Sequence, residues 1–169
     1  MKKVLIALDY NPCSKFVAES GYEIAMAMRA EITILHVITD IAAYSKAYQP
    51  VMGFDRFCVD GPFTDPDEQL REAKGFLAAV IQYLDDRRIE PRVLEGKTAD
   101  MILQFAAEWK ADMIVMGEQS HNGLEKLLMG SVVSDVMRHS AIPLMIVPTA
   151  PERRERRKEY SFMHQYAEC

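Results

Sequence analysis

The fold is decided by Asp112-Met113-Ile114-Val115-Met116-Gly117-Glu118-Gln119-Ser120, which is followed after nine intervening residues by Gly130-Ser131-Val132. The run from Asp112 to Met116 is short and apolar, which is typical of a strand buried on both faces. Gly117 ends that strand, and Gly130-Ser131 opens a helical pattern. A buried strand followed by a helix indicates an α/β unit of the kind that parallel sheets repeat.

The same stretch predicts a loop that receives phosphate groups. A helix N-terminus presents unpaired N–H groups and a partial positive charge, and a glycine there lets the backbone approach an anion closely. The Ser131 hydroxyl adds a donor. Gly-Ser before a helix is also a common cap, and glycine after a strand is ordinary turn chemistry. From this stretch alone, both interpretations stay open.

Composition favours one globular domain. The chain has 169 residues, of which 49% are hydrophobic and 27% charged, which is typical of soluble proteins with one core. The net charge of -5 argues against a nucleic-acid binder. We expect a domain over residues 1–149 and a basic tail over 150–169 that is helical or frayed. We assign that tail no function, because glutamates interrupt its basic run.

The three cysteines are too scattered for a disulfide framework or a paired-cysteine metal site. We therefore expect the reducing cytoplasm as the compartment. The apolar run after Met1-Lys2-Lys3 stops at Asp9, too early for a signal peptide. No segment approaches the roughly 20 apolar residues that cross a bilayer.

Hydrophobic patterns alternate between strands and helices along the chain. We expect strands over residues 4–8, 32–38, 92–94, 112–116 and 143–148, and helices over 15–29, 67–87, around 102–109 and from Gly130-Ser131 to about His139. This alternation predicts an α/β fold with a mainly parallel sheet of five strands. Residues 39–66 form a long aromatic connection, either a lid, a partner surface or partly helical.

In such sheets, ligands bind outside the carboxyl ends of the strands. The ends of the first, second and fourth strands are Leu8-Asp9-Tyr10, His36-Val37-Ile38 and Met116-Gly117. A nucleotide on the fourth-strand loop would place its base between the first two strand ends. Asp9 is either a ligand contact or a turn carboxylate before Asn11-Pro12. His36 lies inside a buried strand, where a core role is the more common one.

These motifs together resemble the universal stress protein family. The resemblance rests on residues 4–9, on Ile34-Leu35-His36-Val37, and on the run from Ile114-Val115-Met116-Gly117 through Gly130-Ser131-Val132 to residues 143–148. The family's ATP-binding branch carries Gly, two residues, Gly, nine residues, then Gly with Ser or Thr. This chain matches at Gly117, Gly130 and Ser131 and has Ser120 in place of the second glycine.

The resemblance implies a single-domain Rossmann-like fold, similar to adenine nucleotide alpha hydrolases, that binds ATP or AMP with Mg or Mn bridging the phosphates. The implied nucleotide-binding residues are Ala7, Leu8, Asp9, Val37, Met116, Gly117, Ser120, His121, Asn122, Gly130, Ser131, Val132 and Val133. A Cβ at Ser120 narrows the site, so we expect weakened binding. The carboxylate of Glu118 would repel a triphosphate unless it points away or shares a metal.

The resemblance also implies a homodimer that pairs through the last strand, Leu144-Met145-Ile146-Val147. Two other functions compete with nucleotide sensing: a dimeric adaptor whose nucleotide site has closed, and a slow ATPase. We identify no catalytic residue, because no positioned general base or arginine finger stands near the loop. Gly96-Lys97-Thr98 mimics the end of a P-loop, yet Pro91 stands where the required glycine would be. It is most simply a strand-to-helix turn.

Overall fold

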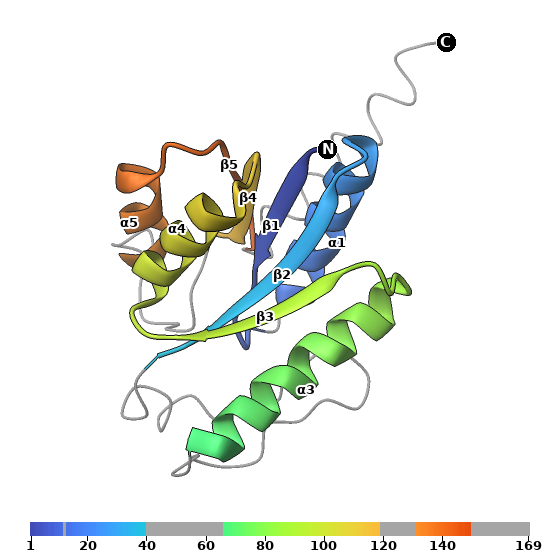
Figure 1. Ribbon diagram of the computed structural model, residues 1–169, viewed down its shortest axis with the longest axis vertical. Helices are drawn as coiled ribbons and strands as arrows, with labels where there is room; N and C mark the ends of the chain where they lie inside the picture. The colour runs from blue at the N-terminus through green and yellow to red at the C-terminus, as the bar shows by residue number, and fades with distance from the viewer. Residues whose placement is uncertain (12, 40–65, 119–130, 150–169) are drawn as a thin grey trace.

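The computed structural model describes residues 1–11, 13–39, 66–118 and 131–149, to which all structural statements below refer. Their sheet has the order β3-β2-β1-β4-β5, and every pairing in it is parallel (Figure 1). The expected α/β fold with a five-stranded parallel sheet is therefore confirmed. The strands are β1 (Lys3–Ala7), β2 (Glu31–Ile38), β3 (Glu90–Glu95), β4 (Met113–Gly117) and β5 (Leu144–Val147), and the helices are α1 (Ser14–Ala27), α3 (Pro66–Leu84), α4 (Thr98–Trp109) and α5 (Ser131–His139).

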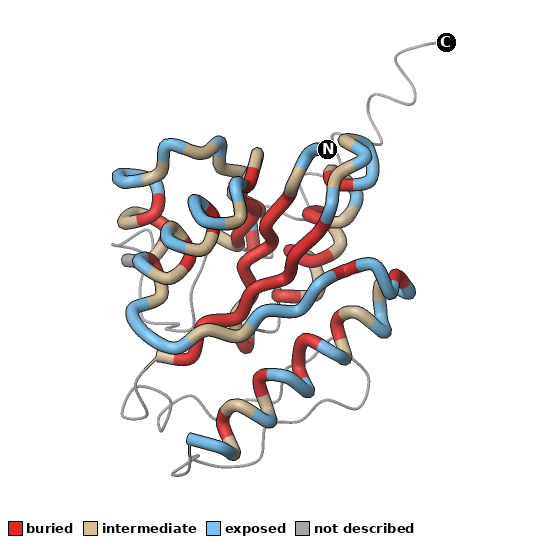
Figure 2. The backbone as a smooth tube through the Cα atoms, viewed as in Figure 1, coloured by how far each residue is buried: buried red, intermediate tan, exposed pale blue. Residues whose placement is uncertain are grey.

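Helices cover both faces of the sheet. Figure 1 shows α1 and α3 on one face and α4 and α5 on the other. Side chains alternate along β1 accordingly: Val4 and Ile6 belong to the core under α1 and α3, whereas Leu5 and Ala7 belong to the core under α4 and α5. The central strands are buried on both sides (Figure 2), which explains why their sequences are mostly apolar.

Helix α1 packs closely on β1 because it carries a glycine at the contact. A Cβ added to Gly21 would lie 2.8 Å from Cδ1 of Ile6, which is itself fully buried. The helix axis can approach the sheet only because that Cβ is absent. This contact sets how α1 lies over the centre of the sheet.

Strand β3 is longer than the expected run of residues 92–94, because it includes Pro91. The Gly96 N–H donates to the Ile38 carbonyl over 3.0 Å, so residues of even number in this stretch direct their backbone groups toward β2. Pro91 has the opposite parity and lies on the open edge, where a missing N–H costs the ladder nothing. Pro91 therefore lies within this edge strand and does not mark its first residue.

The helices that precede β2, β3 and β4 end at left-handed residues. Arg29 and Asp85 each have a φ of 51°, and Lys110 has a φ of 59°. A left-handed residue reverses the chain after a helix, usually as glycine. Because of these turns α1 and α3 stop before the expected residues 29 and 87. All three turns lie at the amino end of the sheet.

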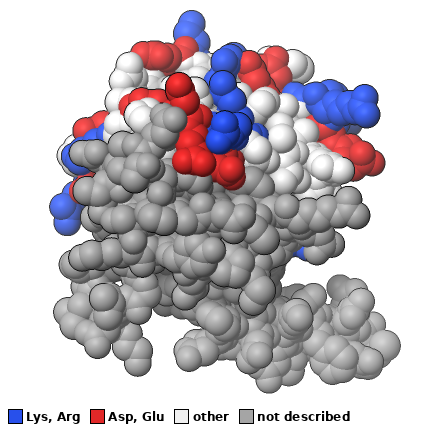
Figure 3. Space-filling model, turned by 90° about the horizontal axis from the view of Figure 1, so that it is seen from below, with Lys and Arg blue, Asp and Glu red and all other residues white. Residues whose placement is uncertain are grey.

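Two expectations concern residues outside the described ranges: a lid, a partner surface or partly helical structure within the connection 39–66, of which residues 40–65 are not described, and a helical or frayed tail over 150–169. Within the described ranges, no helix combines the length and apolarity needed to cross a bilayer. Figure 3 shows the molecule from below the view of Figure 1. Strand β1 runs toward this side. The described charges seen there mix both signs rather than forming a field of one sign.

Candidate functional site

The strand order places a reversal point between β1 and β4. From β1 the chain moves outward to β2 and β3, then crosses back to β4 and moves outward again to β5. Ligands of open α/β sheets bind in the crevice outside the carboxyl ends of the strands at such a point. The crevice between the ends of β1 and β4 is therefore the candidate site.

Strands β1 and β4 end at nearly the same level, whereas β2 continues to Ile38. Ala7 pairs with Leu35 on one side and with Met116 on the other, and Gly117 pairs with Val147. Ala7 and Gly117 therefore place the two smallest side-chain types at the ends of the adjacent strands.

The structure brings several expected site residues onto one face of the sheet. Ala7, Val37, Met116 and Val133 are buried in the core under α4 and α5, and Val132 packs against that core. Leu8 belongs to the opposite core, under α1 and α3. Its side chain therefore points away from these five residues, although its backbone lies just after the end of β1.

The backbone ladder between β1 and β2 stops at the crevice. Its last bond among the described residues runs from the Leu8 N–H to the Leu35 carbonyl, over 2.9 Å. Because partners in a parallel ladder alternate with a period of two, the N–H and C=O of Val37 face the same side as the Leu35 carbonyl. Strand β1 has already ended at that level, so these backbone groups face the crevice.

Asp9 lies in a turn that leads into α1. The Ser14 hydroxyl donates to the Asp9 backbone carbonyl and lies 3.3 Å from the Asp9 carboxylate oxygen Oδ1. The Asn11 side-chain oxygen accepts the Cys13 N–H over 2.9 Å. These contacts fit the turn interpretation of Asp9, and they also hold its carboxylate beside the end of β1. Sequence reasoning missed Ser14, although Asn11 three residues before it is typical of such a turn.

The β4 side of the site is tied to β5. The Glu118 N–H donates to the Val147 carbonyl over 2.9 Å, and the Glu118 oxygen Oε2 is buried. The Cys13 thiol donates to the Thr149 carbonyl over 3.4 Å, which joins the start of α1 to the end of β5. Helix α5 starts at Ser131, as expected. Outside the described residues lie Ser120, His121, Asn122 and Gly130, together with the side chain of Ser131.

The structure also places the other two sequence motifs, at residues 96–98 and at His36. Gly96 and Lys97 form the turn from β3 to α4, which begins at Thr98, so the expected strand-to-helix turn is present; Lys97 pairs with Asp100 over 3.5 Å. His36 is a core residue, 1% exposed, as expected. Among the described residues no group of three or more His, Cys, Asp or Glu side chains is arranged to hold a metal ion.

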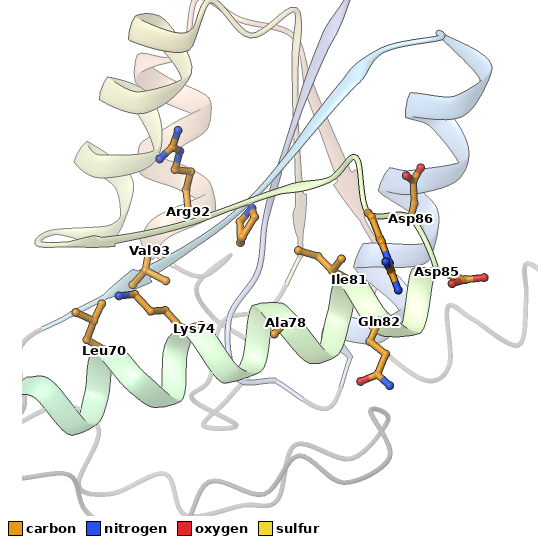
Figure 4. Close-up of a pocket in the computed structure, with 11 residues that line it drawn as sticks. Leu70, Lys74, Ala78, Ile81, Gln82, Asp85, Asp86, Arg92 and Val93 are labelled. Atoms are coloured by element: carbon orange, nitrogen blue, oxygen red, sulfur yellow. The ribbon is translucent and has the colours of Figure 1, made fainter.

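A separate groove of about 1020 Å³ lies between α3 and β3, away from the reversal point (Figure 4). Leu70, Lys74 and Ile81 line it from the helix. In Figure 4 Val93 points from β3 toward α3, whereas Arg92 points to the other side of the strand. The groove follows an edge of the sheet, so it does not share the residues of the candidate site.

The amino end of the sheet holds two paired carboxylates. The buried Asp86 accepts bonds from the Arg88 side chain at 2.6 and 2.8 Å and from the Tyr22 hydroxyl at 3.2 Å. The Arg88 hydrogen bonds hold the pKa of Asp86 well below its usual range. At Asp112 a bond from the Lys2 ammonium at 2.7 Å and one from the Lys3 N–H at 2.8 Å likewise lower the carboxyl pKa.

The fold and the reversal point together define a doubly wound α/β protein whose candidate site lies at the carboxyl edge of its sheet. The sequence model of the universal stress protein family matches residues 1–148, and the chain belongs to that family. A universal stress protein of Methanocaldococcus jannaschii is 29% identical over 149 residues, which cover 86% of this chain and 81% of that protein.

Solved structures show the same fold. A universal stress protein in complex with cAMP matches with a TM-score of 0.60 and 22% identity, over 88% of this chain and 98% of the other. The universal stress protein from Archaeoglobus fulgidus in complex with dAMP matches with a TM-score of 0.56 and 21% identity, over 86% and 97% of the two chains.

Proposed function

We propose that the crevice at the ends of β1, β2 and β4 binds an adenine nucleotide, ATP or AMP, and that the protein acts as a cytoplasmic sensor or regulatory module. The observation that carries the proposal is the end of the β1–β2 ladder, where the backbone groups of Val37 face the crevice beside Ala7. A base can take the hydrogen bonds that a longer β1 would have made.

The two sides of the crevice suit the two ends of a nucleotide. Asp9 lies beside the end of β1, where it can bond a base or sugar. Helix α5 starts at Ser131 after β4, and its N-terminus can receive phosphate. The relatives solved with cAMP and dAMP support an adenine ligand, since both share this fold. We expect any Mg or Mn to enter with the phosphates, which are its preferred ligands.

Calorimetry with ATP, AMP and GTP tests this proposal. We expect the natural protein to bind an adenine nucleotide and Asp9→Ala to weaken that binding about tenfold, as one lost charge-assisted hydrogen bond does. Asp100→Ala is the matched control, because that exposed carboxylate belongs to α4 and pairs with Lys97. Absence of binding at millimolar nucleotide would reject the proposal.

Ser120→Gly separates nucleotide sensing from the adaptor function. If only this variant binds ATP, Ser120 closes the natural site and the protein works through its surface. If both bind, with the glycine variant tighter, the serine only narrows the site. Phosphate release no greater than in a control without protein excludes the slow ATPase.

We also propose that two copies of the chain pair through β5. This strand is an edge of the sheet, and Leu144, Met145 and Ile146 are only partly buried. The Glu118 N–H bonds the Val147 carbonyl, so Leu144 and Ile146, which have the opposite parity, direct their backbone groups outward. An apolar edge with outward donors is suited to pairing with a second copy.

Sedimentation of Ile146→Pro tests the dimer. Proline at 146 removes an outward N–H, as Pro91 does on the other edge, and leaves the β4 ladder in place. We expect the natural protein to be dimeric and this variant to be a folded monomer by circular dichroism. Pro91→Ala should leave the oligomeric state unchanged. A monomeric natural protein at micromolar concentration would contradict the pairing.

A further inference from the structure

A buried aromatic cluster lies at the end of β1 on the α1 and α3 side of the sheet. It consists of Tyr10, His36 and Phe76, which are 8%, 1% and 0% exposed. The His36 ring centroid lies 4.4 Å from that of Tyr10 and 5.8 Å from that of Phe76, and the latter two are 5.1 Å apart. Tilted and edge contacts of this kind fix the orientation of the imidazole.

The fixed imidazole contacts the carbonyl of Leu8, the first residue after β1. Its Nδ1 lies 2.9 Å from the Leu8 carbonyl oxygen. A carbonyl can only accept, so Nδ1 carries the proton and donates it. This bond approaches from beneath the crevice, on the face opposite to Ala7 and Val37.

The same carbonyl has a different partner in a regular ladder. Because the Leu8 N–H donates to the Leu35 carbonyl, the next bond of a parallel ladder would run from the Val37 N–H to the Leu8 carbonyl. His36 binds that acceptor with its side chain instead. The residue that ends the ladder therefore comes from β2 itself, directly before Val37.

We propose that His36 is a positioning residue of the nucleotide site, which holds the Leu8 carbonyl so that the N–H and C=O of Val37 stay available to the base. This inference rests on the proposed function. The two groups of Val37 offer one donor and one acceptor side by side. Adenine presents the complementary N1 acceptor and N6 amino donor, whereas guanine presents an N1 donor and an O6 acceptor in the reverse order. The arrangement therefore also favours adenine over guanine.

The variants His36→Leu and His36→Asn test this role. The asparagine amide nitrogen occupies nearly the place of Nδ1 and can donate to Leu8, whereas leucine cannot. We expect the AMP affinity of His36→Leu to fall about tenfold or more, because one hydrogen bond is lost. His36→Asn should keep the natural AMP affinity. Binding of inorganic triphosphate, which lacks the base, should stay unchanged in both variants.

The rate of amide hydrogen exchange at Val37 separates this role from a purely structural one. In His36→Leu, the Val37 N–H can pair with the Leu8 carbonyl, so we expect its exchange to slow relative to the natural protein and to His36→Asn. A folded His36→Leu protein with natural AMP affinity, or with unchanged Val37 exchange, would overturn the inference.

The two proposals fail in different ways. If the natural protein binds no adenine nucleotide, the proposed function is rejected, and Val37 exchange still decides whether His36 ends the ladder. If His36→Leu does not fold, His36→Gln replaces it, because the longer amide reaches the Nε2 position and leaves Leu8 unbound. Unchanged Val37 exchange in that variant would then count against His36.

Discussion

The two ends of the parallel sheet differ in where their polar groups find partners. At the amino end, Asp86 and Asp112 each accept several hydrogen bonds from neighbouring chain segments. At the carboxyl end, the β1–β2 ladder stops at the Leu35 carbonyl, and the backbone groups of Val37 face the crevice. The amino end thus completes the fold, whereas the carboxyl end leaves the backbone groups of Val37 outside the β1–β2 ladder, where we propose that a ligand binds. Changes at one end should therefore affect stability, and changes at the other should affect binding.

The largest expected effect is on stability, from Asp86→Ala at the amino end. Removing this buried carboxylate leaves Tyr22 and Arg88 without their acceptor, so we expect the free energy of unfolding to fall by about 2–3 kcal/mol. Urea denaturation measures this loss. Glu90→Ala is the control, because Glu90 pairs with Arg92 at the exposed surface and should change stability little. A loss of nucleotide affinity in folded Asp86→Ala protein would contradict the division between the two ends.

Acid should weaken the amino end in a related but smaller way. Hydrogen bonds from Arg88 lower the pKa of Asp86 in the folded protein, so its contribution is fully present above the unfolded pKa of about 4. That contribution falls as the pH drops below this value toward the folded pKa. We expect the stability of Asp86→Asn to depend less on pH below about 4 than that of the natural protein. Parallel acid denaturation curves for the two proteins would disprove this assignment.

At the carboxyl end, Ala7→Val should reduce nucleotide binding. Ala7 lies at the end of β1 beside Met116, so two extra methyl groups would narrow the proposed site. We expect about a tenfold loss of AMP affinity by calorimetry, which corresponds to about 1.4 kcal/mol. Ala141→Val, at an exposed position before β5, should bind normally. Equal affinities in both variants would place the ligand elsewhere.

The smallest effect is expected for Lys110→Gly in the turn before β4. Lys110 has a φ of 59°, a conformation that glycine adopts without the penalty of a Cβ. We expect the relief of this penalty to raise the free energy of unfolding by about 0.5–1 kcal/mol. The greater freedom of glycine in the unfolded chain offsets part of that gain. Lys97→Gly, at an extended position with φ of -71°, should instead lose stability. The denaturation midpoints of the two variants measure these opposite changes in stability.

Local patterns predicted the elements of the fold well, because burial on one or both faces determines which positions must be apolar. The strand at residues 32–38 and the helix start at Ser131 were both expected and are both present. The extension of β3 through Pro91 was missed, because the cost of a proline in a strand depends on which neighbour its N–H would face. That neighbour is set by pairing between distant segments.

The sequence by itself determined the alternation of strands and helices, the family and the candidate residues at the strand ends, since hydrophobic periodicity and short motifs are local properties. Only the tertiary structure decided that Ala7 and Val37 face the same core, and that His36 binds the Leu8 carbonyl. The physical reason is that the direction of a backbone hydrogen bond follows the register between strands, which arises only when β1 and β2 pair.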